Sequence, residues 1–312
     1  MKPGNLELAN ELNNKLTSFS ENIRPLPGID NPVNKQCLVA QMVDSIRRIK
    51  YISAIRDKQL ESINSNPQFA YFDPLKAASW HKQQGNIDEA FWLIFLSTHF
   101  GKNKNTGWNL CRDVYGKLEN QVYWSWPEIS ENFDEFRPWL HENQEIIKSR
   151  GSFGNHRKYQ SLDAYSPTGT GSTIGSYVDW VGPENHHLEK IDLIIQESGP
   201  NPRDLFYALY KSMDSVVGFG RTGKFDFLTM AGKFGLVNIE PGSTYMHGAT
   251  GPKSGAKLLF GGSVNANISD AVLNSYLGEL ETHMGLYFGM QVLEDSICNW
   301  QKDPTRFTHF AG

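Results

Sequence analysis

The spacing of apolar residues along the chain predicts a mainly helical protein. In residues 33–58, Val39, Met42, Val43, Ile46 and Ile49 recur at helical intervals, while the Arg and Lys side chains fall mainly elsewhere on the wheel. Strand-like alternation is scarce. Further helices are predicted over residues 88–96, 108–118, 203–218, 268–284 and 290–301. The pattern therefore predicts an all-α fold.

Two stretches interrupt this helical pattern. Residues 62–76 contain two Asn and two Pro and predict a linker into a second helical region. Residues 151–175 form a long polar stretch rich in Gly, Ser and Thr, which includes the basic and aromatic segment 153–159. A loop of this length is usually functional or disordered, and its aromatic and basic residues argue against disorder. We therefore predict a substrate loop.

Composition narrows the class of protein. At 312 residues and 39% hydrophobic, the chain can bury a large core. The net charge of −4 argues against a protein that coats nucleic acid nonspecifically, so any DNA contact is expected to be local. The three cysteines are too scattered for a zinc or iron–sulfur site. The longest apolar run and the first residues match neither a membrane span nor a signal peptide, which predicts a cytoplasmic protein.

A glycine-rich turn with a lysine inside it precedes the helix that ends near Phe260. Gly248, Gly251 and Gly255 allow close backbone approaches, and exposed N–H groups at the start of a helix can face a phosphate. Lys253 and Lys257 add positive charge there. The segment resembles the hairpin of a helix-hairpin-helix DNA-binding element, and the alternative is an ordinary turn that caps a core helix.

Other motifs extend this resemblance. The segment 91–99 resembles the early helix of helix-hairpin-helix DNA glycosylases, with His99 at the position of the side chain that fills the gap left by a flipped base. Several blocks together resemble the α-glutamyl/putrescinyl thymine pyrophosphorylase clade of that superfamily. These blocks are residues 98–101, 153–159, 219–222 with Phe225 and Asp226, 249–252, and 293–295 with 298–302.

The resemblance implies a helix-hairpin-helix glycosylase-like domain over residues 81–312, preceded by an N-terminal helical extension over residues 1–80. It also implies double-stranded DNA with modified bases as the partner, no membrane and no cofactor. The first hypothesis is an anti-phage glycosylase that flips and excises a bulky pyrimidine, such as glucosylated hydroxymethylcytosine, and leaves an abasic site. The alternative is a phage-type transferase that replaces a pyrophosphate on a hydroxymethyl-pyrimidine with an amine. A catalytically silent reader of modified DNA is a third possibility, and the oligomeric state stays open.

Three acids are candidates for the catalytic carboxylate. Asp270 lies 17 residues after Lys253 (270 − 253), a spacing close to that of the superfamily, although Asp270 could equally serve the first turn of a helix. Glu294 and Asp295 are adjacent on a helix, so at most one is expected to face a site. An ion pair with Arg157 or Arg221 is their alternative role.

The remaining candidates fall into two sets. Arg157, Lys158 and Arg221 could bind phosphates, a glucosyl group or pyrophosphate, while Asn155 and His156 could bind a base edge. No lysine occupies the Schiff-base position just before the catalytic aspartate, so we expect a monofunctional N-glycosylase without lyase activity. The predicted base or modification pocket consists of Asn155, His156, Arg157, Lys158, Arg221 and Asp226. The predicted DNA-binding residues are Thr250, Gly251, Lys253, Gly255, Lys257 and His99, and no metal ligands are predicted.

Overall fold

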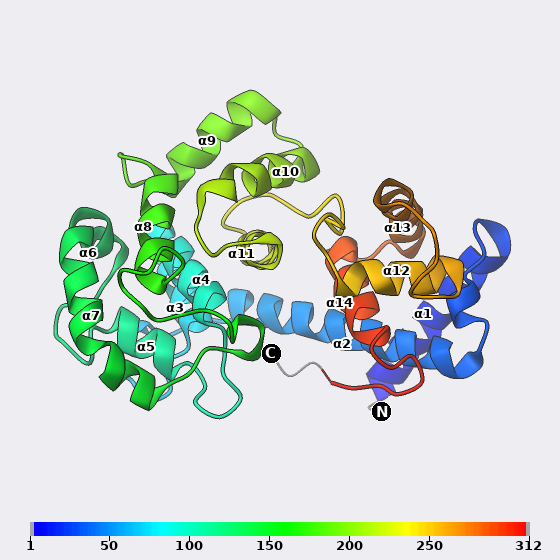
Figure 1. The fold of residues 1–312 in the computed structure, drawn as a ribbon, viewed down its shortest axis with the longest axis horizontal. Helices are drawn as coiled ribbons and strands as arrows, with labels where there is room; N and C mark the ends of the chain where they lie inside the picture. Colours follow the sequence, from blue (N-terminus) through cyan, green and yellow to red (C-terminus); the bar gives the residue numbers. More distant parts are fainter. Residues whose placement is uncertain (1–2, 310–312) are drawn as a thin grey trace. The chain divides into compact units, whose positions relative to one another are not determined.

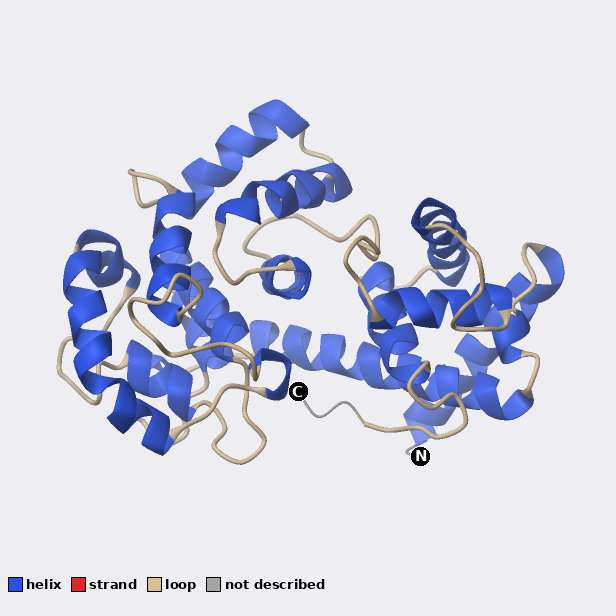
Figure 2. Cartoon of the chain, in the orientation of Figure 1, coloured by secondary structure: helices blue, strands red, loops and turns tan. Residues whose placement is uncertain are grey.

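The computed structural model describes residues 3–309, and Figure 1 shows how the chain passes from helix to helix. Within this range the regular structure consists of fourteen α-helices and four short 3₁₀ helices, without a strand (Figure 2). This confirms the predicted all-α fold class. None of these helices combines the length and the apolar character that a membrane span requires.

The chain divides into two compact units. Of the described residues, the first unit contains 3–51 and 241–309, and the second is Ile52–Glu240. The predicted boundary between residues 80 and 81 falls within a helix of the second unit. The existence of a separate N-terminal extension stays a prediction.

Five helices build the first unit around one apolar core. Phe19, Leu277 and Trp300 are fully buried in it. The Ser269 side chain accepts a hydrogen bond from the Val272 N–H and so caps the start of α13. The helices are α1 (Pro3–Asn22), α2 (Pro32–Asp57), α12 (Gly251–Gly261), α13 (Asp270–Met284) and α14 (Gly289–Trp300), where α2 also contributes its last residues to the second unit, and the 3₁₀ helix η1 is Pro27–Ile29.

The second unit packs around one apolar helix. Every residue from Glu89 to Phe100 in this helix, α4, is buried, as expected for a helix that is apolar on all sides. At its centre, the Phe95 ring stacks on those of Tyr177 and Phe219. The helices are α3 (Pro74–Gln83), α4 (Ile87–Phe100), α5 (Asn109–Tyr115), α6 (Trp126–Glu131), α7 (Phe133–Arg150), α8 (Thr170–Val181), α9 (His187–Ser198), α10 (Pro202–Ser212) and α11 (Arg221–Phe234), with the 3₁₀ helices η2 (Ser62–Ser65), η3 (Asn155–Arg157) and η4 (Met213–Ser215).

Two expected elements end elsewhere in the structure. The helix expected over residues 108–118 ends at Tyr115, because Lys117 and Leu118 adopt positive φ angles. The polar stretch 151–175 is a loop only up to residue 169, since α8 begins at Thr170. A Cβ at Gly171 would lie 2.0 Å from the Ala164 carbonyl oxygen, so tight packing against the preceding chain explains a helix in a glycine-rich segment.

Candidate functional site

Three separate blocks of the sequence converge on Arg157 in the second unit. The Arg157 Nε donates a 2.7 Å hydrogen bond to the Thr98 carbonyl oxygen at the end of α4. Its Nη2 forms a 2.7 Å ion pair with Asp226 Oδ2 on α11. The fold therefore joins residues 98–101, 153–159 and 219–226, which are far apart in the chain.

The Arg157 side chain mainly holds the loop in place. It is only 10% exposed, whereas the Asp226 side chain is nearly half exposed. The neighbouring backbone is also fixed, because the Gly154 N–H donates to the Phe100 carbonyl oxygen at 2.8 Å. These contacts hold the short helix η3 against the end of α4.

His99 lies in the last turn of α4, next to Thr98. It is 1% exposed, and its Nε2 lies 2.9 Å from Thr170 Oγ1. Burial, together with the nearby Arg157 cation, lowers the pKa of His99 to about 3, so the imidazole is neutral at physiological pH. His99 is therefore a buried, hydrogen-bonded residue in this structure, and its role in filling the gap left by a flipped base stays a prediction.

The exposed part of the loop carries the other predicted pocket residues. Asn155, His156 and Lys158 are exposed, and Lys158 Nζ lies 5.0 Å from the centre of the Tyr159 ring. Tyr159 is 90% exposed. Arg221 begins α11, and the Gln160 side chain reaches the nearby Gly218 carbonyl oxygen at 3.3 Å. The loop and the start of α11 are therefore neighbours.

The predicted hairpin lies in the first unit, where Thr250 precedes α12. A Cβ at Gly251 would lie 2.6 Å from Cys298 Sγ, and one at Gly255 would lie 2.2 Å from the Ile297 carbonyl oxygen. Both glycines therefore allow α12 to pack closely on α14. This favours the alternative, an ordinary turn before a core helix, as the reason for these glycines. Whether the segment binds DNA stays a prediction.

The lysines of this segment have different environments. Lys253 Nζ forms a 2.7 Å ion pair with Asp270 Oδ1, and both side chains are about one-third exposed. Asp270 is the first residue of α13. Asp270 therefore lies in the first turn of a helix, as its alternative role predicted, and is paired with Lys253. Lys257, one turn beyond Lys253 on α12, is partly buried.

The other two candidate acids lie on α14 in the same unit. Glu294 is buried, while Asp295 is partly exposed. Asp295 Oδ2 accepts hydrogen bonds from Ser45 Oγ at 2.8 Å and from Arg48 Nη2 at 3.1 Å. Asp295 is thus paired with Arg48 on α2, within the first unit.

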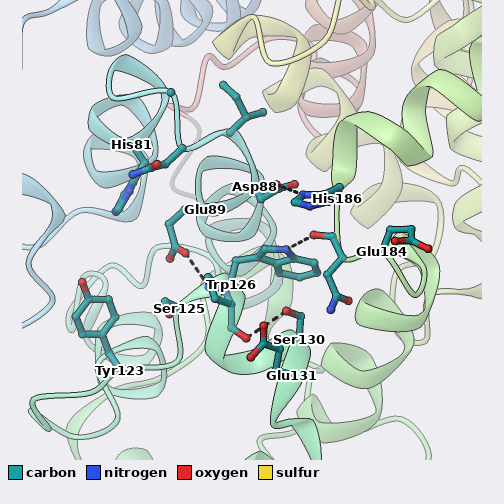
Figure 3. A pocket seen from close by; sticks show the side chains of 15 residues that line it. His81, Asp88, Glu89, Tyr123, Ser125, Trp126, Ser130, Glu131, Glu184 and His186 are labelled. Atoms are coloured by element: carbon teal, nitrogen blue, oxygen red, sulfur yellow. Dashed lines mark hydrogen bonds and ion pairs between the residues drawn. The ribbon is translucent and has the colours of Figure 1, made fainter.

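A pocket in the second unit was missed by sequence reasoning. It has a volume of about 530 Å³ and lies at the start of α4, where Asp88 and Glu89 line it with Trp126 (Figure 3). The sequence feature that could have indicated this pocket is the pair of adjacent acids, Asp88 and Glu89, at the start of an otherwise apolar helix.

The buried acid of this pocket is Glu89. Its Oε1 accepts a hydrogen bond from the Tyr115 hydroxyl and its Oε2 one from the Trp126 N–H, both at 2.7 Å. Burial raises the pKa of the Glu89 carboxyl to about 7 in spite of these hydrogen bonds. The group can therefore gain or lose a proton near neutral pH.

The pKa of the Asp88 carboxyl is lowered, whereas that of Glu89 is raised. Burial opposes its ionisation, but hydrogen bonds from His187 and His186 outweigh this effect and hold its pKa at about 2. His187 in turn lies 2.7 Å from the Tyr177 hydroxyl, so these groups form a chain into the core. Among the described residues, no group of three His, Cys, Asp or Glu side chains is placed to hold a metal ion.

Comparison with known proteins identifies the family. The model of the alpha-glutamyl/putrescinyl thymine pyrophosphorylase clade 3 matches residues 33–312, which is most of the chain. The chain belongs to this family. No curated protein matches the sequence, and no solved structure matches the fold.

Family membership corrects the expected enzyme class. We expected a monofunctional DNA N-glycosylase, but the family is a pyrophosphorylase clade, so the N-glycosylase assignment is wrong. The motifs that suggested excision, a lysine-bearing turn and a nearby acid, are equally compatible with another reaction on DNA. Membership of the wider helix-hairpin-helix glycosylase superfamily stays a prediction.

Proposed function

We propose that this protein is a transferase that replaces a pyrophosphate group on a hydroxymethyl-pyrimidine in DNA with an amine. The amine nitrogen forms a bond to the exocyclic methylene carbon, and the carbon–oxygen bond to pyrophosphate breaks. The electron pair leaves with the pyrophosphate oxygen, and the amine loses a proton to a base. The observation that carries this proposal is the family match over residues 33–312, whose description names thymine pyrophosphorylases.

The region around Arg157 supports the leaving-group half of this reaction. Pyrophosphate gains negative charge as it departs, and cations or orphan N–H groups stabilise such charge. Lys158 is exposed and follows Arg157, whose partner Asp226 lies on α11, the helix that Arg221 begins. The residue before α11, Gly220, supplies no side-chain cap, so the first N–H groups of the helix favour an anion.

The same region supports contact with an unpaired base. Tyr159 is 90% exposed on a segment that the Arg157–Asp226 ion pair fixes in place. Every nucleobase presents a flat face, and stacking on an aromatic ring contributes about 1–3 kcal/mol per base. We assign Tyr159 to this contact.

The decisive assay follows pyrophosphate. Duplex DNA with a pyrophosphorylated hydroxymethyluracil is incubated with the protein and with glutamate or 1,4-diaminobutane, and released pyrophosphate and the digested nucleosides are measured. We expect release only when both the modified base and an amine are present, with a nucleoside of the mass of the amine adduct. If neither pyrophosphate nor the adduct forms with any amine, the proposed function is wrong.

Matched variants assign the residues. Lys158→Gln is expected to lower kcat/KM about tenfold, because it removes one cation near the leaving group. Lys104→Gln, at another exposed lysine of the same unit, serves as the control. Tyr159→Ala is expected to weaken binding to single-stranded DNA by about tenfold, whereas Tyr71→Ala, at a tyrosine that is 80% exposed, should leave it unchanged. Equal effects within either pair would remove that assignment.

A further inference from the structure

Residues 116–123, between α5 and α6, form a strained segment beside the pocket at the start of α4. Lys117, Leu118 and Glu119 have consecutive positive φ angles of 50°, 57° and 68°. Residues other than glycine rarely adopt this conformation, because the Cβ comes too close to the following carbonyl oxygen. The last residue of the segment, Tyr123, lines the pocket. The segment therefore stores strain that a movement away from the pocket would release.

Both ends of this segment are attached to one buried carboxyl group. Glu89, which is 7% exposed, accepts hydrogen bonds from the Tyr115 hydroxyl just before the segment and from the Trp126 N–H shortly after it. The Trp124 N–H donates to the Tyr115 carbonyl oxygen at 2.8 Å, and both of these side chains are fully buried. The ends of the segment therefore meet at Glu89, as the ends of a compact surface loop do.

Tyr123 packs on this junction. Its ring centre lies 5.2 Å from that of Tyr115, and Tyr123 and Glu89 line the same pocket (Figure 3). Burial and the nearby Glu89 carboxyl both raise the pKa of Tyr123, which agrees with this proximity. A movement that carries Tyr123 away from Tyr115 would therefore admit water to the Glu89 carboxyl.

The middle of the segment is held by exposed contacts. Glu119 Oε1 lies 3.4 Å from Arg150 Nη1, and Gln68 Nε2 donates to the Asn120 carbonyl oxygen at 3.0 Å. An exposed ion pair of this kind contributes little to stability. Strain inside the segment and weak contacts at its surface both favour a local movement over a global one.

Ionised Glu89 is poorly stabilised while the segment is packed. Burial raises the pKa of its carboxyl to about 7 from an ordinary 4.5, and the negative charge of Asp88 adds to this effect. None of the described residues that line the pocket is a lysine or an arginine, and the His186 ring is bound to Asp88. The titratable groups around Glu89 are Asp88 on α4, Tyr115 on α5, Tyr123 on the segment, Glu131 on α6, His81 on α3, and Glu184 and His186 before α9.

Rising pH therefore favours movement of the segment. When water reaches Glu89, its carboxyl loses its proton at the ordinary pKa of 4.5, whereas the packed carboxyl keeps the proton up to about pH 7. The moved segment thus binds fewer protons between these two values, so the equilibrium shifts toward it as the pH rises. Burial of His81 has the opposite sign, because it lowers the pKa of His81 to about 4. Comparison with a Glu89→Gln variant isolates the effect of Glu89.

We propose that residues 116–123 form a lid on the pocket at the start of α4, and that loss of the Glu89 proton releases this lid. The proton passes to water, and the moved lid leaves the ionised carboxyl hydrated. The buried side chains of Tyr115 and Trp124 stay packed and bound the moving part. The lid does not rest on the proposed function, since its movement can be measured without any reaction.

Hydrogen exchange of the full chain, corrected for the intrinsic rate at each pH, tests the lid. The reporting amides are those of Leu118 and Asn120, which donate to the Asp113 and Gly116 carbonyl oxygens. Between pH 5 and pH 7, their protection in the wild type should fall about fortyfold relative to Glu89→Gln, as pKa values of 4.5 and about 7 require. An equal pH dependence in the two proteins would overturn the proposal. Lid amides that exchange only as slowly as those at the centre of α4 would overturn it as well.

Two glycine variants test the strain. Glu119→Gly relieves one positive φ angle and should raise the protection of the lid amides about threefold, because glycine adopts this conformation without a clash. Gln121→Gly is the control, at an exposed residue of the same segment without a positive φ angle. It should lower protection about threefold, because glycine gains more freedom in the moved segment. Equal effects of the two variants would contradict a strained lid.

A third variant tests the cover over Glu89. Tyr123→Ala removes the ring that packs on Tyr115, so the pKa of Glu89 should move from about 7 toward 4.5 in a carboxyl-carbon NMR titration. Tyr71→Ala, at an exposed tyrosine of the same unit, should leave this pKa unchanged. An unshifted pKa of Glu89 in folded Tyr123→Ala would mean that the segment does not shield the carboxyl, and the lid would be refuted.

Discussion

Replacing Gly255 by alanine distinguishes two roles for the glycines of residues 248–255. The turn could be shaped to contact phosphate, or its glycines could serve the packing of α12 on α14. In the structure, a Cβ at Gly255 would lie 2.2 Å from the Ile297 carbonyl oxygen and 2.6 Å from its carbon. Both atoms are backbone, so no side-chain rotation can remove the clash.

The magnitude follows from this geometry. Carbon–oxygen contacts are ordinarily about 3.4 Å, so the two helices must separate locally by about 1.2 Å. A gap of this size forfeits a substantial part of the dispersion energy along the contact, and overpacking typically costs about 1–3 kcal/mol. Alanine recovers about 1 kcal/mol through helix propensity. Because the clash is with backbone atoms, we expect the cost at the upper end of this range, about 3 kcal/mol, which leaves a net loss of about 2 kcal/mol in the free energy of unfolding.

Gly278→Ala is the matched control. Gly278 is also a helical glycine of the first unit, on α13, but no atom lies within 4 Å of its added Cβ. This variant should gain about 1 kcal/mol, so the two variants should differ by about 3 kcal/mol in urea unfolding followed by circular dichroism. If Gly255→Ala unfolds at the same urea concentration as Gly278→Ala and only loses DNA affinity, the packing explanation is wrong.

Three further predictions concern single residues. Buried His99 has a pKa of about 3 against an ordinary 6.5, so the unfolded chain takes up its proton first and stability falls as the pH drops below about 6.5. Between pH 7 and pH 5 this loss is about 2 kcal/mol in urea unfolding, and it should be absent from His99→Phe; an unchanged pH dependence would refute it. Asp214→Asn deprives the buried Lys224 ammonium of its partner and should cost about 1–3 kcal/mol, whereas Lys211→Gln, at an exposed lysine on the same carboxylate, should cost less than about 0.5 kcal/mol; equal losses of thermal stability would contradict this. Asp270→Asn breaks a partly exposed ion pair and should change stability by less than about 1 kcal/mol, so a larger change would mean that Asp270 has a structural role.

The sequence could predict those helices whose own apolar pattern determines them. The helices expected over residues 33–58, 268–284 and 290–301 match α2, α13 and α14 to within two residues at either end. The start of α8 could not be predicted, because glycine, serine and threonine favour a loop by local propensity. There, contact with distant residues decides the structure: the added Cβ of Gly175 would lie 2.5 Å from the Phe133 ring.

The candidate sites were predictable only in part. The blocks around Arg157 could be selected from their resemblance, but their convergence depends on partners that lie 59 and 69 residues away. The pocket at the start of α4 was missed because its contacts also join residues that lie far apart in the chain. The Tyr115 hydroxyl and the His187 N–H, which bind Glu89 and Asp88, are 26 and 99 residues away from them. No local pattern encodes such distances.

The role of Arg157 follows from how its side chain is used. Its Nε and Nη2 are already bound and it is only 10% exposed, so it is better placed to fix the loop than to bind a ligand. A fixed loop loses less conformational entropy on binding, which strengthens the contacts of its exposed residues. A substitution at Arg157 should therefore weaken every ligand that touches the loop by a similar factor. A substitution at Lys158 should instead weaken chiefly those ligands that carry phosphate, because only they gain from its charge.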